Sequence, residues 1–196
     1  MPRIFAISDL HVDYSDNMAQ MLSLSESEYR NDVLIVAGDC TDSLDRLSQL
    51  FDSLQKKFQT ICFVPGNHEL WIKNNSFRDS IQKFHAVLEL CKDFGVKTQP
   101  HKMVGKSKNI WLVPLFSWYR LPEYGSETLY IQKTSENPAA FTWSDDRYCK
   151  WPADFNEISP ADYFAELNEA YIARVVEDDS DGEKIPLFHL AIFYHS

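Results

Sequence analysis

Residues 32–39 read Asp-Val-Leu-Ile-Val-Ala-Gly-Asp, an uninterrupted apolar run that a glycine and an acidic residue close. A run without polar alternation is typical of a strand buried on both faces of a parallel sheet. Similar β-forming runs occupy residues 3–8 and 60–64, and Pro65-Gly66 closes the second of them. The sequence therefore predicts strands at 3–8, 32–37 and 60–64.

A segment with helical periodicity follows each of these strands. Apolar residues recur at helical spacing within 16–29, 43–58 and 76–94, with Asp16 as the expected N-cap of the first helix and Gly95 as the end of the third. Alternating strands and helices imply an α/β fold with a mostly parallel sheet and right-handed crossovers.

The second half of the chain is less regular. A strand is expected over 109–119, at an edge or with a bulge because Pro114 interrupts it. Residues 120–158 are interpreted as an ordered excursion over the surface, since their many aromatic side chains need burial. A helix is expected from Ser159-Pro160 to about 177, and a last apolar strand from 185 to 194.

Composition limits the class of protein. A chain of 196 residues forms one sizeable domain, so we expect a single domain over 1–196. The net charge of −10 argues against a dedicated nucleic-acid binder, which uses a basic surface. No stretch is long and apolar enough for a membrane span or signal peptide. Four widely spaced cysteines favour buried thiols in a reduced, cytoplasmic protein.

Three short polar motifs stand at the ends of the three predicted strands. They are Asp9-Leu10-His11, Gly38-Asp39 and Gly66-Asn67-His68-Glu69. The carboxyl ends of parallel strands line one edge of a sheet, so these motifs are expected to converge. In an extended segment the side chains of Asp9 and His11 would point the same way and grip one cation. Carboxylates with imidazole suit Mn, Fe or Zn.

These motifs, in this order, resemble the opening signature of the calcineurin-like metallophosphoesterases. The stretches 7–14, 64–71, 114–119 and 149–152 are also similar to a plant and algal branch of that family. The resemblance implies an αββα sandwich and a dinuclear metal centre that hydrolyses a phosphoester. It also implies two divalent or trivalent ions, with Mn, Fe or Zn as the expected elements.

The same resemblance assigns roles residue by residue. Asp9 and His11 would hold the first metal, Asp39 would bridge both metals, and Asn67 would bind the second through its amide oxygen. His68 would be the general acid that protonates the departing alkoxide. Asp42 would act through hydrogen bonds to these groups.

The family pattern also includes a histidine after a later strand and then a G-H-x-H element. His195, which ends the apolar run 190–194, fits the histidine as a further metal ligand, with His189 as the competing alignment. The G-H-x-H element is absent from the sequence, which stops at Ser196. We therefore expect a family member whose C-terminal part is missing, one that binds metal weakly and aggregates or needs a partner.

Other candidates have plainer interpretations. His85 and His101 are expected to be structural or solvent-facing, and the aromatic residues Trp118, Tyr119, Trp143 and Trp151 are expected to pack rather than line a pocket. Arg120 is a weak candidate for a phosphate contact. The first hypothesis is a metal-dependent phosphoester hydrolase acting on a small molecule or a phosphorylated substrate. The alternatives are a weakly active or inactive remnant serving as a binding module, and a nuclease.

Overall fold

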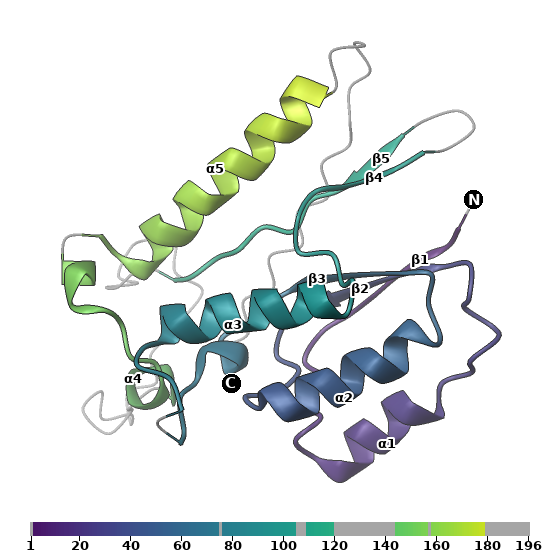
Figure 1. The fold of residues 1–196 in the computed structure, drawn as a ribbon, viewed down its shortest axis with the longest axis horizontal. Helices are drawn as coiled ribbons and strands as arrows, with labels where there is room; N and C mark the ends of the chain where they lie inside the picture. Colours follow the sequence, from purple (N-terminus) through teal and green to yellow (C-terminus); the bar gives the residue numbers. More distant parts are fainter. Residues whose placement is uncertain (1, 75, 105–108, 120–143, 157, 179–196) are drawn as a thin grey trace, which may run out of the picture.

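The first half of the chain forms a three-stranded parallel sheet in the order β1-β2-β3 (Figure 1). The strands are β1 Ile4–Ile7, β2 Val33–Ala37 and β3 Thr60–Val64. Ile7 pairs with Val36, which in turn pairs with Phe63, so the three strands end close together. The computed structural model describes residues 2–74, 76–104, 109–119, 144–156 and 158–178.

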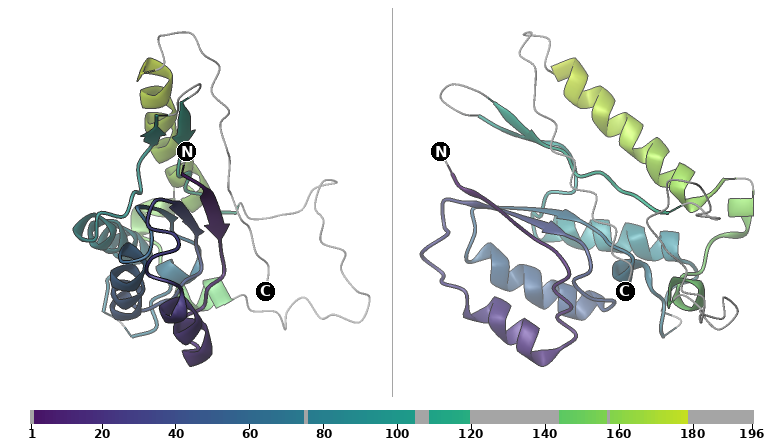
Figure 2. Two further views of the ribbon diagram at one scale, coloured as in Figure 1. Left: turned by 90° about the vertical axis from the view of Figure 1, so that its right-hand side faces the viewer. Right: turned by 180° about the vertical axis from the view of Figure 1, so that it is seen from behind.

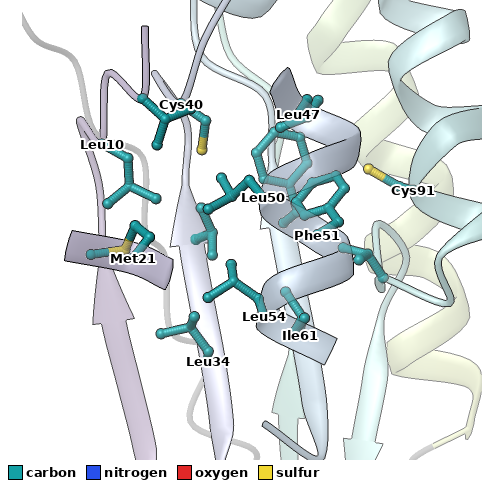
Figure 3. Close-up of a cluster of buried hydrophobic side chains, with 14 of the residues drawn as sticks. Leu10, Met21, Leu34, Cys40, Leu47, Leu50, Phe51, Leu54, Ile61 and Cys91 are labelled. Atoms are coloured by element: carbon teal, nitrogen blue, oxygen red, sulfur yellow. The ribbon is translucent and has the colours of Figure 1, made fainter. Parts of the chain in front are cut away.

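Three helices cover one face of this sheet: α1 Ser15–Ser23, α2 Leu44–Gln55 and α3 Ser80–Asp93. Their buried side chains share one apolar cluster with alternate residues of the strands (Figure 3). On β2 these are Leu34 and Val36, and Phe51 of α2 lies fully buried among them. Burial of this apolar face is the main force that fixes the helices on the sheet.

The opposite face of the sheet carries a second layer of strands. An antiparallel pair, β4 His101–Met103 and β5 Ile110–Leu112, packs Met103 and Leu112 against Val33 and Cys62 of the parallel sheet. The last described helix, α5 Pro160–Asp178, closes the far side (Figure 2), where Val175 packs with Trp111 and Val113. The layer order is helix, sheet, sheet, helix, which confirms the predicted α/β sandwich class.

The predicted helix boundaries were partly wrong. α1 ends at Ser23 rather than near 29, because the buried Lys57 ammonium donates hydrogen bonds to the carbonyls of Leu22 and Leu24. Asp16 lies in the first turn of α1, and Tyr14 is the N-cap residue. α3 begins at Ser80, where Asp79 caps it by accepting from the Gln82 amide at 2.7 Å.

The strand predicted over 109–119 is regular only at β5. Further on, the backbone of Phe116 pairs with the side chain of Asn168 on α5, by hydrogen bonds of 2.8 and 2.6 Å. A side-chain amide thus takes the place of a neighbouring strand. Within 120–158 the described residues contain α4 Ser144–Tyr148 and a 3₁₀ turn, Ala153–Asn156. The strand predicted at 185–194 lies outside the described residues.

The thiols agree with the expected burial of the cysteines. Cys40, Cys62 and Cys91 are buried free thiols, and Cys149 is partly buried. Among the helices of the described residues, none combines the length and apolar character needed to cross a membrane.

An ion pair fastens the edge strand to the centre of the sheet. The Asp32 carboxylate accepts from the backbone amide of Arg3 at 2.8 Å and from its guanidinium at 2.6 and 3.0 Å. The hydrogen bonds from Arg3 lower the pKa of Asp32 below its ordinary value.

The Arg3–Asp32 pair makes stability depend on acid pH. A carboxyl group with a lowered folded-state pKa stabilises the fold above its unfolded pKa of about 3.9, and the contribution is lost as pH falls through the folded-state pKa. Arg3→Met should therefore lower the urea midpoint at pH 6, and the difference from wild type should shrink below about pH 4. Lys56→Met, which breaks an exposed pair with Asp52, is the control. A difference that stays constant down to pH 2.5 would contradict the role of this pair.

Candidate metal and catalytic site

The loops after β1, β2 and β3 lie side by side at the carboxyl edge of the sheet. The Asp9 amide donates to the Gly38 carbonyl at 3.1 Å, and the His11 amide donates to the Asp39 carbonyl at 3.0 Å. The third loop joins them where the His68 amide donates to the Asp39 carboxylate at 3.2 Å. The structure thus brings together the three motifs that the sequence placed at strand ends.

The backbone at the candidate ligands is not extended. Asp9, His11 and Asp39 have φ angles of 55°, 41° and 55°, and they are the non-glycine residues with positive φ within the described ranges. The extended geometry predicted for Asp9 and His11 was therefore wrong, since β1 already ends at Ile7. Left-handed backbone at non-glycine residues stores strain of order 1–3 kcal/mol each, and such strain gathers at functional sites.

Gly38 and Gly66 permit an unusually close approach of the second and third loops. A Cβ atom on Gly66 would lie 2.3 Å from the Asp39 carboxylate oxygen Oδ1, and one on Gly38 would lie 2.7 Å from the Gly66 amide nitrogen. Gly38 also has a φ of 75°, which residues with side chains rarely adopt. No side chain fits at either position: at Gly66 it would collide with the Asp39 carboxylate, and at Gly38 with the backbone of Gly66. The pocket that holds the Asp39 carboxylate therefore depends on glycine at these positions.

The buried carboxylate of Glu69 links the second and third loops by hydrogen bonds. Its side chain is 1% exposed and accepts hydrogen bonds from four backbone amides. Oε1 accepts from Cys40 and Thr41 at 2.7 and 3.1 Å, and Oε2 accepts from Asp39 and Gly66 at 3.0 and 2.7 Å. Burial, and then the charge of Asp39, raises the pKa of Glu69 to about 7, while the amide donors act to lower it.

Negative charge accumulates at this edge of the sheet. Asp39 is 9% exposed. Burial and the charge of Asp9 raise the pKa of Asp39, against the hydrogen bond from the His68 amide. A bound cation would relieve this repulsion and favour the ionised form of the carboxylate. The electrostatics of the three loops therefore favour a cation.

The donor types at this edge suit a transition metal, but the side chains are not arranged as a ligand set. Among the residues that the structure describes, no group of three or more His, Cys, Asp and Glu side chains is arranged to hold a metal ion. The loops of Asp9, His11 and Asp39 meet, but these three side chains are not gathered into a ligand set. By chemical type, their carboxylates and imidazole and the amide oxygen of Asn67 are donors that suit a divalent transition metal.

His68 lies between another imidazole and an indole. Its ring stacks on Trp71 with centroids 3.7 Å apart at 30°, and the ring of His11 lies 4.6 Å away, edge to face. Burial, and then the neighbouring groups His11 and Lys73, lowers the pKa of His68 to about 4. The imidazole is therefore neutral at pH 7 in the metal-free protein.

Two residues of this neighbourhood escaped the sequence analysis. Asp145 on α4 accepts a hydrogen bond from the Asn67 amide nitrogen at 2.8 Å and another from the Trp71 indole. Trp71 stands two residues after the end of the third motif, and its ring covers His68. Trp71 could have been found from its place beside the motif, whereas Asp145 lies in a stretch without periodicity and gave no signal.

Asp42 belongs to the periphery of the site. Its carboxylate pairs with Lys73, and its carbonyl accepts from the buried Lys83 ammonium at 2.7 Å. The Lys73 ammonium lies 4.9 Å from the centre of the Trp71 ring. Asp42 thus reaches the site through Lys73 and Trp71.

The remaining candidates mostly behave as packing residues. Trp118 and Trp151 meet edge to face at 4.9 Å within the cluster around Phe164. His85 lies within hydrogen-bond distance of the Tyr163 hydroxyl, at 3.1 Å. His101 opens β4 rather than a polar loop, because its backbone pairs with Leu112. The candidates outside the described residues are Arg120, Trp143, His189 and His195.

Comparison with known proteins gives two relatives of similar sequence. The chain is 34% identical over 126 residues to the acyl-carrier-protein phosphodiesterase PptH of Mycobacterium tuberculosis, an alignment covering 60% of this chain and 38% of the relative. It is 30% identical over 96 residues to an uncharacterized protein of Acanthamoeba polyphaga mimivirus, covering 45% of this chain and 34% of that protein. The chain therefore spans well under half the length of either relative.

The fold agrees with these sequence matches. The crystal structure of the phosphopantetheinyl hydrolase PptH from M. tuberculosis superposes with a TM-score of 0.63 at 24% identity, covering 90% of this chain and 64% of that one. The family model of the calcineurin-like phosphoesterases matches residues 2–174, which include all three loops. The chain thus belongs to the calcineurin-like phosphoesterase family.

Proposed function

We propose that this protein is a metal-dependent phosphoester hydrolase whose active site is the carboxyl edge of the β1-β2-β3 sheet. The observation that carries the proposal is the meeting of the Asp9-x-His11, Gly38-Asp39 and Gly66-Asn67-His68 loops at that edge. The close approach of Gly66 to Asp39 and the nearby negative charge of Asp9 support the proposal, because a bound cation would reduce the electrostatic repulsion there.

The metal centre is proposed to be dinuclear. Asp9, His11 and Asp39 would hold one ion, and Asp39 and Asn67 the other, with His195 as a further ligand by family resemblance. The ions would be Mn, Fe or Zn, given a donor set of carboxylate, imidazole and amide oxygen. When bound, they would supply Lewis-acid activation of the phosphoryl group and of water.

His68 is proposed as the general acid for the leaving alkoxide. Its position against Trp71 restrains the ring, and burial keeps it neutral in the free protein at pH 7. An anionic phosphoester beside the ring would favour the imidazolium form, because an opposite charge raises the pKa of a histidine. The proton would then be held where the leaving oxygen departs.

A phosphodiester is the substrate class that we favour over a monoester. The M. tuberculosis relative with 34% identity is named as a phosphodiesterase.

The buried free thiols support a reducing compartment, the cytoplasm, as the place where the protein acts.

His68→Ala tests the proposal. We expect Mn²⁺-dependent hydrolysis of bis(p-nitrophenyl) phosphate by the wild type, faster than hydrolysis of p-nitrophenyl phosphate. For a diester with an alkoxide leaving group, loss of the general acid should lower turnover by about 10²- to 10⁴-fold. The loss should be smaller for p-nitrophenolate, a stable anion that departs without a proton. The matched control is His85→Ala, since His85 lies on α3 and contacts Tyr163 away from the loops.

Each result decides between the candidates. Turnover by the wild type that falls in His68→Ala and not in His85→Ala supports the hydrolase. A wild type that binds Mn²⁺ but turns over neither ester would contradict the hydrolase and favour a binding module on the same fold. Preference for the monoester would overturn the diester assignment alone.

A further inference from the structure

Asp145 reaches the candidate site from a distant part of the sequence. It lies on α4, and 78 residues separate it from Asn67, to which it is hydrogen-bonded at 2.8 Å. The same oxygen, Oδ1, also accepts from the Trp71 indole nitrogen. Two side chains, those of Asn67 and Trp71, therefore donate to one carboxylate oxygen.

A carboxylate selects one orientation of the Asn67 amide. The two branches of an asparagine amide are similar in shape, so only hydrogen bonding distinguishes the oxygen from the nitrogen. An ionised carboxylate accepts and cannot donate, so the branch of Asn67 that faces Asp145 has to be the NH₂ group. The carbonyl oxygen of Asn67, the atom with affinity for a metal ion, is thereby directed away from Asp145.

The second hydrogen bond fixes the aromatic neighbour of His68. The indole of Trp71 is a donor only, and Asp145 supplies its acceptor. With the indole nitrogen anchored, the ring lies against the His68 imidazole at a centroid distance of 3.7 Å. One side chain therefore orients Asn67 directly and the ring packed against His68 through Trp71.

α4 is itself held in place by the chain around it. The Ile72 amide donates to the Tyr148 carbonyl at 2.8 Å, and the Ser80 amide donates to the Lys150 carbonyl at 2.7 Å. The Lys150 amide in turn donates to the Ser80 hydroxyl at 3.0 Å. These contacts attach α4 to the segment between the third loop and α3, so Asp145 is presented on a fixed support.

We propose that Asp145 is a positioning residue that orders the metal-binding oxygen of Asn67 and the ring contact of His68. This inference rests on the proposed metal site and adds to it a residue outside the three motifs. Its neighbour Asp146 lies on the same helix with an exposed side chain and provides a matched comparison.

The test measures Mn²⁺ affinity by calorimetry on the full chain without substrate. Asp145→Leu keeps the size of the side chain and removes the acceptor, and loss of a group that orients a metal ligand weakens binding by about 10- to 100-fold. Asp145→Asn should stay within about threefold of the wild type, since the Trp71 donor selects the carbonyl branch of the new amide and a neutral acceptor still makes the bond. Asp146→Leu and Asp146→Asn should leave the affinity unchanged.

A double-mutant cycle separates positioning from general destabilisation. If Asp145 acts through Asn67, Asp145→Leu should have no further effect on Mn²⁺ affinity in an Asn67→Ala background, whereas a purely structural role would give additive losses. If Asp145→Leu does not fold, Asp145→Ala, which admits water, enters the same cycle. A wild type that binds no Mn²⁺ overturns the proposed metal site. If the wild type binds Mn²⁺, and Asp145→Leu and Asp145→Ala bind it with the same affinity, only the role of Asp145 is overturned.

Discussion

Asp39→Asn is expected to abolish turnover while leaving the metal-free protein at least as stable as the wild type. The Asp39 carboxylate is buried beside Asp9, and both burial and that charge disfavour its ionised form. An asparagine keeps the acceptor oxygen for the His68 amide and tolerates the left-handed backbone at φ 55°. The substitution therefore removes an electrostatic cost together with the proposed bridging ligand.

The measurement pairs activity with thermal unfolding in EDTA. Turnover should fall by more than about 100-fold, beyond the loss typical for groups that only support a metal ligand. A gain of about 1 kcal/mol would raise the Tm of a chain of this length by about 2–4 °C. Asp52→Asn, which changes an exposed carboxylate on α2, is the control for both quantities. Retained turnover would show that Asp39 is not the bridging ligand. A large drop in Tm would show that the carboxylate stabilises the fold.

Glu69→Leu is expected to prevent folding, the largest stability effect in the molecule. It would leave three buried backbone amides and one partly buried amide without an acceptor, around a residue that is 1% exposed. Each unsatisfied buried donor costs about 1–3 kcal/mol, and the sum is comparable to the whole stability of a domain, about 5–15 kcal/mol. Circular dichroism of the purified chain would show the loss of helix.

Glu69→Gln offers a graded version of the same test. One oxygen remains to accept two amides, but the new NH₂ group faces the other two donors. We expect a stability loss of about 2–6 kcal/mol in urea unfolding, from two amides that lose their acceptor. Glu89→Gln, on an exposed part of α3, should change stability by less than about 0.5 kcal/mol. Equal urea midpoints for the two glutamine variants would refute the bracing role of Glu69.

The parts of the fold that follow from local pattern were predictable from the sequence. Continuous apolar runs located β2 and β3, and a stripe of leucines located α2. Where the prediction failed, a distant side chain decides the local structure. Lys57 ends α1 early, and Asn168 replaces a strand partner at Phe116. Neither interaction has a signal within a window of neighbouring residues.

The candidate site divides in the same way. Strand ends and motif order predicted that the loops of Asp9, Asp39 and Asn67 would meet, because parallel topology requires it. The left-handed backbone at Asp9 was not predictable, since its sequence also suits an extended conformation. Asp145 was beyond reach because its role depends on how α4 packs against the third loop.

Because Asn67 and Asp145 are far apart in sequence, the two residues of this hydrogen bond are synthesised at different times. A ribosome adds about 5–20 residues per second, so the 78 residues between them take roughly 4–16 s to make. In that interval the nascent chain already contains the Asp9, Asp39 and Asn67 loops but not the carboxylate that orients the Asn67 amide. If Asp145 positions Asn67 as proposed, full metal affinity would be acquired only after residue 145 has been made, later than the helical layer over β1, β2 and β3.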